Sequence, residues 1–538
     1  MKFNRIIQKL KRKLNDSKGM ALLATLIFTV VISTLGIALL TMTNNDTKLT
    51  TLQKESSEAF YSADSGINRA INWLERKPSP PPASAINAID FLNGEKWVDI
   101  EGNEYPVDAT LNPGEYYKIE MSLPVTVNFL QSYKIISTGK LVGPNRNATR
   151  VIEKLVDITS FAEYAYFANS GATNLWFADG SIVDGRLHTN EKLRILGNPT
   201  FKGLATAVDG IVWGNDEPTG DEKDKIFLEG YRVGPAEYIK LPDKVGDISG
   251  TGNPLSLESI AMGSGIPTGN GVYVPHDVSD NITGGIYVEG NLDELHLTTV
   301  NTTVNSLSVI NFRQGSTYTT ITTLPAGSID PYDSTPVTSD KTVIKKSTDP
   351  SPSYCDGLTN GLLYVNGEIE SLEAPESEGG HQGKLTIVAT EDITITDDIK
   401  YKTLIDHPEI DIHTDNPEEL LPITDTLGII SSGDVVLKIL SSDSPNPIVC
   451  STIMALGESL TNYYSNRSPV GNFTLFGGLI HMRDAIMGYS DWNGNIIRGY
   501  IEDYTFDERN NDPTSDSIPP YFPTTGNYEP IYWMESNG

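Results

Sequence analysis

Residues 18–43 read KGMALLATLIFTVVISTLGIALLTMT, and the 24 residues after Gly19 carry no charge. A helix of that length rises about 36 Å at about 1.5 Å per residue, enough to cross a hydrocarbon core of roughly 30 Å. The 19 residues before it hold one acidic side chain and seven basic ones, which gives +6 (7 − 1); the basic ones are Lys2, Arg5, Lys9, Lys11, Arg12, Lys13 and Lys18.

The distribution of charge predicts an orientation. The whole chain has a net charge of −30, so the residues after Gly19 sum to −36 (−30 − 6). Basic residues beside an apolar segment stay in the cytoplasm, so we expect the acidic body on the far side of a membrane. Binding to nucleic acid needs a basic face. An isoelectric point near 4.6 therefore argues against a nucleic-acid partner.

Three interpretations compete for the apolar run. A secretory signal peptide has a shorter apolar core, roughly 7–15 residues, followed by an Ala-x-Ala-like cleavage site. This run is longer, and no such site follows it. An ordinary membrane anchor fits its length and its basic flank. In the third interpretation the chain is cut before the apolar run, so that the anchor is retained.

The helical pattern continues beyond the apolar run. Apolar and small side chains recur three and four residues apart, which is one stripe along a helix: Leu49, Leu52, Ser56, Ala59, Phe60, Ala63, Ile67, Ala70, Ile71 and Leu74. Prolines at 78, 80, 81 and 82 then stop it. We therefore expect one helix over residues 20–76, which is some 80 Å long at about 1.5 Å per residue.

The junction Lys18-Gly19-Met20-Ala21-Leu22-Leu23 resembles the prepilin cleavage site of type IV pilins and type II secretion pseudopilins. The resemblance implies that residues 1–19 are a leader, that prepilin peptidase cuts after Gly19, and that the new N-terminal Met20 is methylated. The fifth mature residue of these proteins is usually Glu, but here it is Ala24. Members that lack this Glu are PilX-like and GspK-like minor subunits, for which a place at or near the filament tip is expected.

Residues 58–74, EAFYSADSGINRAINWL, are similar to a run that PilX-type proteins carry at this distance from the cleavage site. The resemblance implies that residues 20–76 pack with other pilins or pseudopilins. It also implies a single-pass protein of the bacterial inner membrane that later reaches the pilus or cell surface. The choice between a type IV pilus and a type II secretion pseudopilus stays open.

After a Pro-rich hinge the pattern changes from helix to sheet. Alternating apolar and polar residues predict four strands, separated by turn residues: 96–100, 116–122, 132–140 and 149–158. A helix followed by a small antiparallel sheet is the pilin-like layout. We assign residues 84–158 to this domain.

From residue 160 to 538 short strands recur, each ending at Gly, Asn or Asp, as in 284–290 and 361–367. Repeated apolar triplets separated by turns are typical of a β-solenoid, whose rungs bury their inward residues on one another. A β-sandwich is the alternative. The fold class is therefore α+β: a long membrane helix, a small pilin-like antiparallel sheet and a large mainly-β domain, for which we favour a β-helix.

The sequence holds no HExxH, GxSxG, P-loop or CxxC pattern, which favours a structural, non-catalytic protein without a cofactor. Calcium is a weaker hypothesis: Asp491, Asn493, Asn495 and Glu502 fall at positions 1, 3, 5 and 12 of an EF-hand-like loop, although position 6 is Ile496 and not Gly. The alternative function is a tip-displayed adhesin, or a β-helix that binds or cleaves polysaccharide with carboxylates on one face.

Cys355 and Cys450 are the two cysteines. An extracytoplasmic location permits one disulfide between them. Their positions in the sequence do not decide whether they pair.

Overall fold

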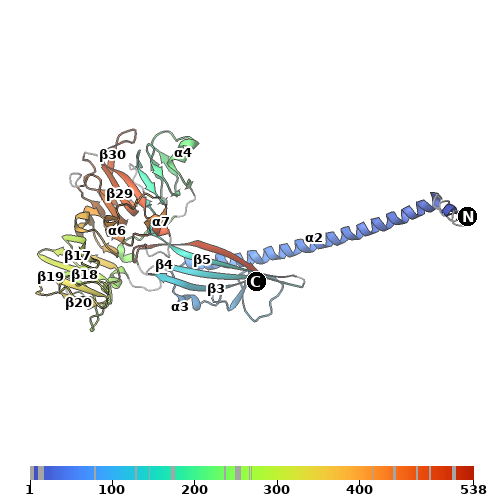
Figure 1. The fold of residues 1–538 in the computed structure, drawn as a ribbon, viewed down its shortest axis with the longest axis horizontal. Helices are drawn as coiled ribbons and strands as arrows, with labels where there is room; N and C mark the ends of the chain where they lie inside the picture. The colour runs from blue at the N-terminus through green and yellow to red at the C-terminus, as the bar shows by residue number, and fades with distance from the viewer. Residues whose placement is uncertain are drawn as a thin grey trace.

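A computed structural model of the chain describes Arg5, residues 7–9 and residues 17–537, except 78–79, 128–129, 145, 171–175, 235–237, 249–255, 266, 268, 415, 440–443, 468–470, 484–485 and 512–516. One helix projects from a body that is almost entirely β (Figure 1).

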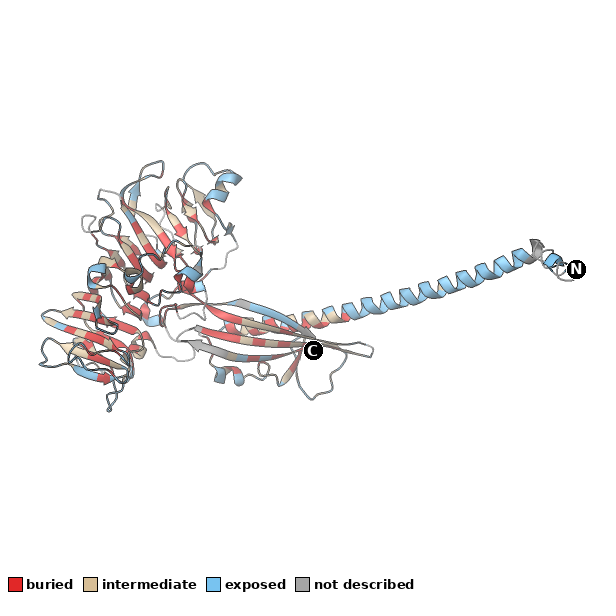
Figure 2. Ribbon diagram, in the orientation of Figure 1, coloured by how far each residue is buried: buried red, intermediate tan, exposed pale blue. Residues whose placement is uncertain are grey.

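The projecting helix α2 spans Ser17–Glu75 and is unbroken across Gly36 and Gly66. Figure 2 shows the projecting part exposed all round and the last part buried against the body. The helix ends just before the proline cluster, because proline lacks the N–H group that a helix interior needs. The short helix α3, Ala83–Asn87, begins directly after Pro82.

Six antiparallel strands form a sheet against α2, called here the helix-bound sheet. Its order is β2-β1-β3-β4-β5-β32, with bounds Glu104–Pro106, Lys96–Asp99, Gly114–Val127, Leu130–Gly143, Arg146–Ser160 and Thr524–Asn537. The four strands predicted from the sequence correspond to β1, β3, β4 and β5. The last strand, β32, returns from the C-terminal end of the chain, so residues 524–537 complete this sheet and lie outside the large body to which the sequence analysis assigned them.

Small residues allow α2 to lie directly on this sheet. A Cβ atom added to Gly139 on β4 would collide with the backbone oxygen of Ala59 and lie 2.5 Å from the backbone nitrogen of Ala63. On the helix, a Cβ atom at Gly66 would collide with Oγ of Ser137. The small side chains of the 58–74 run are therefore explained by close contact between helix and sheet.

Residues 161–523 form a second body, called here the parallel stack. Its main ladder joins ten strands side by side in parallel, in the order β15 (Ile286–Glu289), β21 (Leu362–Asn366), β23 (Lys384–Ala389), β25 (Thr426–Ser431), β27 (Ile448–Ala455), β29 (Gly471–Arg483), β6 (Tyr166–Ser170), β8 (Leu187–Thr189), β11 (Ala205–Ala207) and β13 (Tyr231–Val233). The early strands β6–β13 therefore lie against the late strand β29, at one end of the stack.

Three further ladders run beside the main one. The second joins β16 (Glu294–Asn301), β22 (Ile369–Ala374), β24 (Ile393–Ile399), β26 (Val435–Leu437) and β28 (Leu460–Asn462). The third continues from β29 through β31 (Ile496–Phe506) and β7 (Ile182–Asp184) to β10 (Thr200–Phe201). The fourth pairs β9 (Leu193–Ile195) with β12 (Ile211–Trp213). These parallel ladders favour the solenoid interpretation over a sandwich.

Antiparallel strands lie at the β15–β16 end of the stack and beside β31. β17 (Ser306–Gln314), β18 (Thr317–Leu324), β19 (Lys341–Lys346) and β20 (Ser353–Asp356) form a meander after β16, β14 (Gly271–Tyr273) pairs with β15, and β30 (Gly488–Ser490) pairs with β31. Short helical segments lie between strands: α4 (Gly220–Ile226), α5 (Leu257–Met262), α6 (Lys402–Asp406), α7 (Pro417–Leu420), η1 (Phe161–Glu163), η2 (Val245–Asp247), η3 (Glu376–Glu378) and η4 (Glu508–Asn511).

Both faces of the main ladder are buried. The inward row includes Ile387, Ile429 and Ile453, all in the central core. The outward neighbours of these residues form a second row that is covered by residues 239–248 and 256–262, called here the strap. Strands buried on both faces are apolar without alternation. This explains why β25 reads TLGIIS and is buried at every position.

The fold class predicted from the sequence is confirmed. The chain is α+β, with one long N-terminal helix, an antiparallel sheet packed against that helix, and a large mainly-β body (Figure 1).

Candidate functional site

The first candidate is the exposed, projecting part of α2 from Met20 to Met42, called here the free half of α2. The large apolar side chains from Met20 to Met42 are all 52–73% exposed. By length and composition, the segment Met20–Glu75 holds a stretch that can cross a membrane. An apolar surface of this extent marks a membrane or a protein partner. The predicted cut lies in the first turns of α2, with Gly19 and Met20 both helical. Of the predicted leader, residues 1–4, 6 and 10–16 lie outside the described residues.

The second half of α2 is fastened to the helix-bound sheet by polar contacts at its rim. Arg69 donates to the hydroxyl of Tyr117 at 3.0 Å, and its guanidinium lies 4.5 Å from the centre of the Phe91 ring. Arg146 on β5 pairs with Glu58 of the helix. The amphipathic run 58–74 therefore packs against the chain's own sheet. The free half of α2 makes no such contact with the described part of the body.

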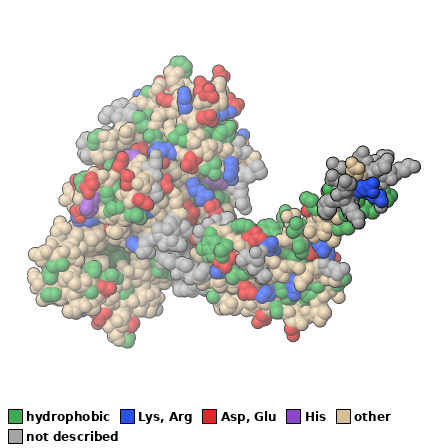
Figure 3. Space-filling model, turned by 45° about the vertical axis from the view of Figure 1, so that its right-hand side comes forward, with side chains coloured by type: hydrophobic (Ala, Val, Ile, Leu, Met, Phe, Trp, Pro, Cys, Tyr) green, Lys and Arg blue, Asp and Glu red, His purple; other side chains and the backbone are tan. Residues whose placement is uncertain are grey.

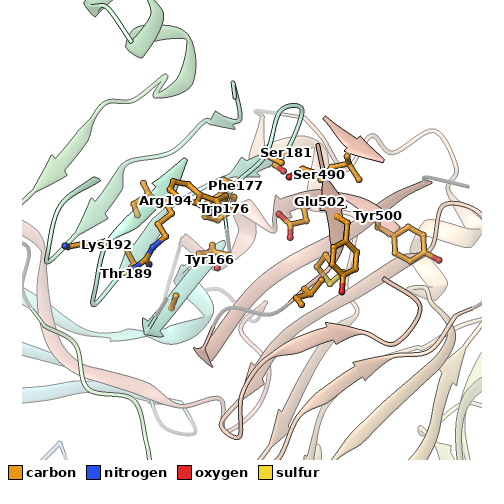
Figure 4. A pocket seen from close by; sticks show the side chains of 18 residues that line it. Tyr166, Trp176, Phe177, Ser181, Thr189, Lys192, Arg194, Ser490, Tyr500 and Glu502 are labelled. Carbon is orange, nitrogen blue, oxygen red and sulfur yellow. The ribbon is translucent and has the colours of Figure 1, made fainter. Parts of the chain in front are cut away.

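The second candidate is a cavity of about 350 Å³, called here the junction pocket, between the early strands of the stack and the β30–β31 hairpin. One wall comes from residues 166–194 and the other from residues 486–502 (Figure 4). Aromatic rings on both walls alternate with hydroxyl groups. These side chains are Tyr166, Trp176, Phe177, Tyr489 and Tyr500, with Ser181, Thr189 and Ser490.

Two cationic residues, Lys192 and Arg194, line one wall of the junction pocket, and the carboxylate of Glu502 belongs to the other wall (Figure 4). Arg194 is the middle residue of β9, and its Nη1 is buried without a hydrogen-bond partner among the described residues. The backbone N–H of Phe177 donates to the Arg194 carbonyl at 3.0 Å, which holds the adjacent Trp176 beside this strand. Glu502 lies two residues from Tyr500 and two from Tyr504 on β31, so the three side chains share one face of the strand. Both tyrosines belong to the core, so this face is the inward one.

Three of the predicted calcium ligands, Asp491, Asn493 and Asn495, lie in the turn of the β30–β31 hairpin, and the fourth, Glu502, lies on β31. Asp491 is used inside the hairpin turn, where its Oδ1 accepts from the backbone nitrogens of Asn493 at 2.8 Å and Asn495 at 3.0 Å. These bonds lower the pKa of Asp491, with the side-chain amide of Asn495 as the largest cause. Glu502 lies in the junction pocket instead. No group of three or more His, Cys, Asp or Glu in the described part of the chain could hold a metal ion. The calcium site stays a prediction.

Both cysteines are buried free thiols, so the structure contains no disulfide between them. Cys355 lies on β20 in the antiparallel meander, and Cys450 lies on β27 in the main ladder. Burial raises the pKa of Cys450 to about 12, which keeps this thiol protonated.

Two segments, residues 185–190 and 504–509, hold parts of the stack together. In Gly185-Arg-Leu-His-Thr-Asn190, the Asn190 side chain bonds the backbone N–H and carbonyl of Ile239, where the strap begins. Burial lowers the pKa of His188, which contacts Asn190 at 3.0 Å. In the 504–509 run, Arg509 makes a buried 2.5 Å ion pair with Asp507. These motifs are explained by structure without a catalytic role.

Comparisons with known proteins do not assign the chain to a named function. A family described as "Domain of unknown function (DUF4900)" matches residues 128–209, from the end of the helix-bound sheet into the early strands of the stack. No curated protein matches. The crystal structure of the competence-associated pilin ComZ from Thermus thermophilus is similar over 90% of this chain and 98% of that one, at 12% identity and a TM-score of 0.28. Overlap at so low a TM-score supports no conclusion.

Proposed function

We propose that this chain is a minor pilin or pseudopilin that is held in the inner membrane and then built into a helical filament. The observation that carries the proposal is the division of α2 into two halves. The second half is committed to the chain's own sheet, whereas no described residue of the chain covers the apolar surface from Met20 to Met42. A membrane covers it before assembly, and the helices of neighbouring subunits cover it afterwards.

The proposal places the subunit at or near the tip of the filament. Ala24, at the fifth position after the proposed cut, is exposed on the free half of α2. A Glu at this position in the related families neutralises a neighbouring subunit's N-terminal amine, and a buried amine without its partner is costly. A subunit without this carboxylate is therefore disfavoured inside the filament shaft. The large body also suits a position with free space around it.

The proposed role is structural and not catalytic. On the face shown in Figure 3, acidic side chains are spread over the body, and Lys and Arg side chains do not form a continuous patch. This supports partners other than nucleic acid. The proposed partners are prepilin peptidase, other pilins or pseudopilins through residues 20–76, and the inner membrane. The domain assignment at 1–19, 20–76, 84–158 and the following body belongs to the same proposal, with 524–537 added to the sheet domain.

Mass spectrometry of the mature N-terminus tests the proposal. We expect a peptide that begins at methylated Met20 in cells with prepilin peptidase, and an uncut leader in a strain without the enzyme. The uncut protein should remain in the membrane fraction, because α2 is present in both forms. An intact Met1 leader in both strains would show a plain membrane-anchored protein and would remove the filament assignment.

A further inference from the structure

The junction pocket has the composition of a binding site for a small polar ligand with apolar faces. Its volume of about 350 Å³ lies within the roughly 300–1,000 Å³ of small-molecule sites, toward the lower end. Its aromatic rings offer flat apolar surfaces, and its serine and threonine hydroxyls offer hydrogen bonds between them. Of common ligands, sugar rings combine an apolar face with several hydroxyl groups in this way.

Arg194 favours a ligand that carries a negative charge. Its Nη1 is buried and has no acceptor among the described residues, and a buried donor without an acceptor is costly. A guanidinium binds a carboxylate through two parallel hydrogen bonds.

The opposite wall sets the orientation of the ligand. Glu502 faces the interior beside Tyr500, and the Tyr500 hydroxyl donates to the Ile439 carbonyl at 3.4 Å. A carboxylate can accept hydrogen bonds from ligand hydroxyls but repels a second carboxylate. An acidic group of a ligand would therefore be directed toward Arg194, and its hydroxyl groups toward Glu502.

We propose that the junction pocket binds an acidic saccharide, one or two sugar rings with a carboxylate held by Arg194 and hydroxyl groups held by Glu502. The sugar rings lie against the aromatic side chains of the two walls. This site is independent of the filament role, since it lies in the parallel stack and shares no residue with α2.

The test is isothermal titration calorimetry of the full chain in detergent with digalacturonic acid and with the corresponding neutral disaccharide. We expect saturable binding of the acid, and binding of the neutral sugar weaker by about tenfold to a hundredfold, the usual value of a hydrogen bond to a charged group. Equal binding of the two sugars, or no saturable heat with either, overturns the proposal. Binding of benzoate in place of the sugar acid would identify an aromatic-acid site and also overturns it.

Variants of Arg194 separate recognition from folding. Arg194→Gln should weaken binding of digalacturonic acid by about tenfold or more and leave the neutral sugar unaffected. Arg194→Lys keeps the charge but loses the planar fork, so we expect an intermediate affinity. Arg313→Gln, on β17 outside the pocket, removes one charge as a control and should bind like the wild type. If Arg194→Lys melts like the wild type and both Arg194 variants bind like it, Arg194 is not the anion site.

Discussion

Gly139 lies where the helix and the sheet come closest. A Cβ atom there would meet backbone atoms of Ala59 and Ala63, which cannot move aside as a side chain can. We expect Gly139→Ala to lower the free energy of unfolding by about 2 kcal/mol, as overpacking does in cores. Gly36→Ala is the matched control, because nothing lies within 4 Å of an added Cβ on the free half of α2. Thermal unfolding in detergent checks both, and equal midpoints would contradict the close contact.

The buried carboxyl group of Glu163 should make the free energy of unfolding fall as the pH rises. Burial raises its pKa to about 8, and the Ser160 N–H and Arg186 offset this only in part. Nη1 of Arg186 lies 3.6 Å from Oε2 of Glu163, whereas Nη2 lies 2.8 Å from Oε1 of Glu529. Arg186 therefore forms its shorter ion pair with Glu529. Between the ordinary value of 4.5 and about 8, the folded state holds a proton that the unfolded chain has released. The free energy of unfolding therefore falls across this window by about 1.4 kcal/mol per pH unit at most.

Glu163→Gln tests this dependence, since the amide oxygen can still accept from Ser160. We expect the variant and the wild type to unfold at similar temperatures at pH 4.5, and the variant to be more stable at pH 8.5. Glu222→Gln is the control: Glu222 fills the same capping position after Thr219, but it is exposed and its bonds to Thr219 lower its pKa. A gain for Glu163→Gln that is the same at both pH values would show that charge on Glu163 is not the cause.

At the scale of elements, local pattern predicted most of what was found. The uncharged run and the stripe from Leu49 to Leu74 predicted α2 correctly. A helix can be predicted in this way because its periodicity depends on residues that are close in the sequence. The predicted strand segments 284–290 and 361–367 contain β15 and β21. Short strands between turn residues are likewise a local signal.

Pairing between distant segments was not visible in the sequence. β32 was missed because Gly526 and Pro530 interrupt its pattern and its partner β5 ends 364 residues earlier in the sequence (524 − 160). The contact of β29 with β6 also joins late and early residues. Local alternation fixes which face a residue lies on but not which strand lies beside it.

The junction pocket depends on that same distant contact. Arg194 and Glu502 meet across it only because the early strands lie on the late ones. The sequence singled out Glu502 as a calcium ligand, and the structure places it in the lining of the junction pocket. The available signal was the row Tyr500-x-Glu502-x-Tyr504, in which a carboxylate takes a position facing the core.

At the scale of the whole molecule, the parallel stack is an insertion in the helix-bound sheet. The chain leaves the sheet at Ser160 and returns at Thr524, and these two residues are paired across β5 and β32. The Phe161 N–H donates to the Pro523 carbonyl at 3.0 Å, so the entrance and exit of the stack are adjacent. The helix and its sheet therefore form one unit, and a body inserted between β5 and β32 leaves the exposed half of α2 unchanged.

This arrangement predicts that the stack can be removed without loss of the sheet, provided that β32 is kept. In the first variant, residues 161–523 are replaced by Asn-Gly, a favoured two-residue connection between antiparallel strands. In the second, residues 161–538 are deleted. The second variant loses the ring contact of Tyr528 with Tyr133 and the 3.6 Å ion pair of Glu535 with Arg150, and it leaves β5 as a long unpaired edge. We expect the first variant to resist protease in detergent and the second to be degraded or to aggregate.

The same pair of variants separates the two roles assigned to the chain. If α2 and its sheet carry assembly, the first variant should enter filaments in cells that lack the full chain, but it should not bind the acidic saccharide. Filaments that fail to form with a folded, membrane-inserted first variant would move the assembly role into the stack. Degradation of both variants to the same extent would show that the sheet depends on the stack for its stability, which contradicts the insertion argument itself. Protease resistance is therefore measured first, because only a folded sheet makes the filament result decisive.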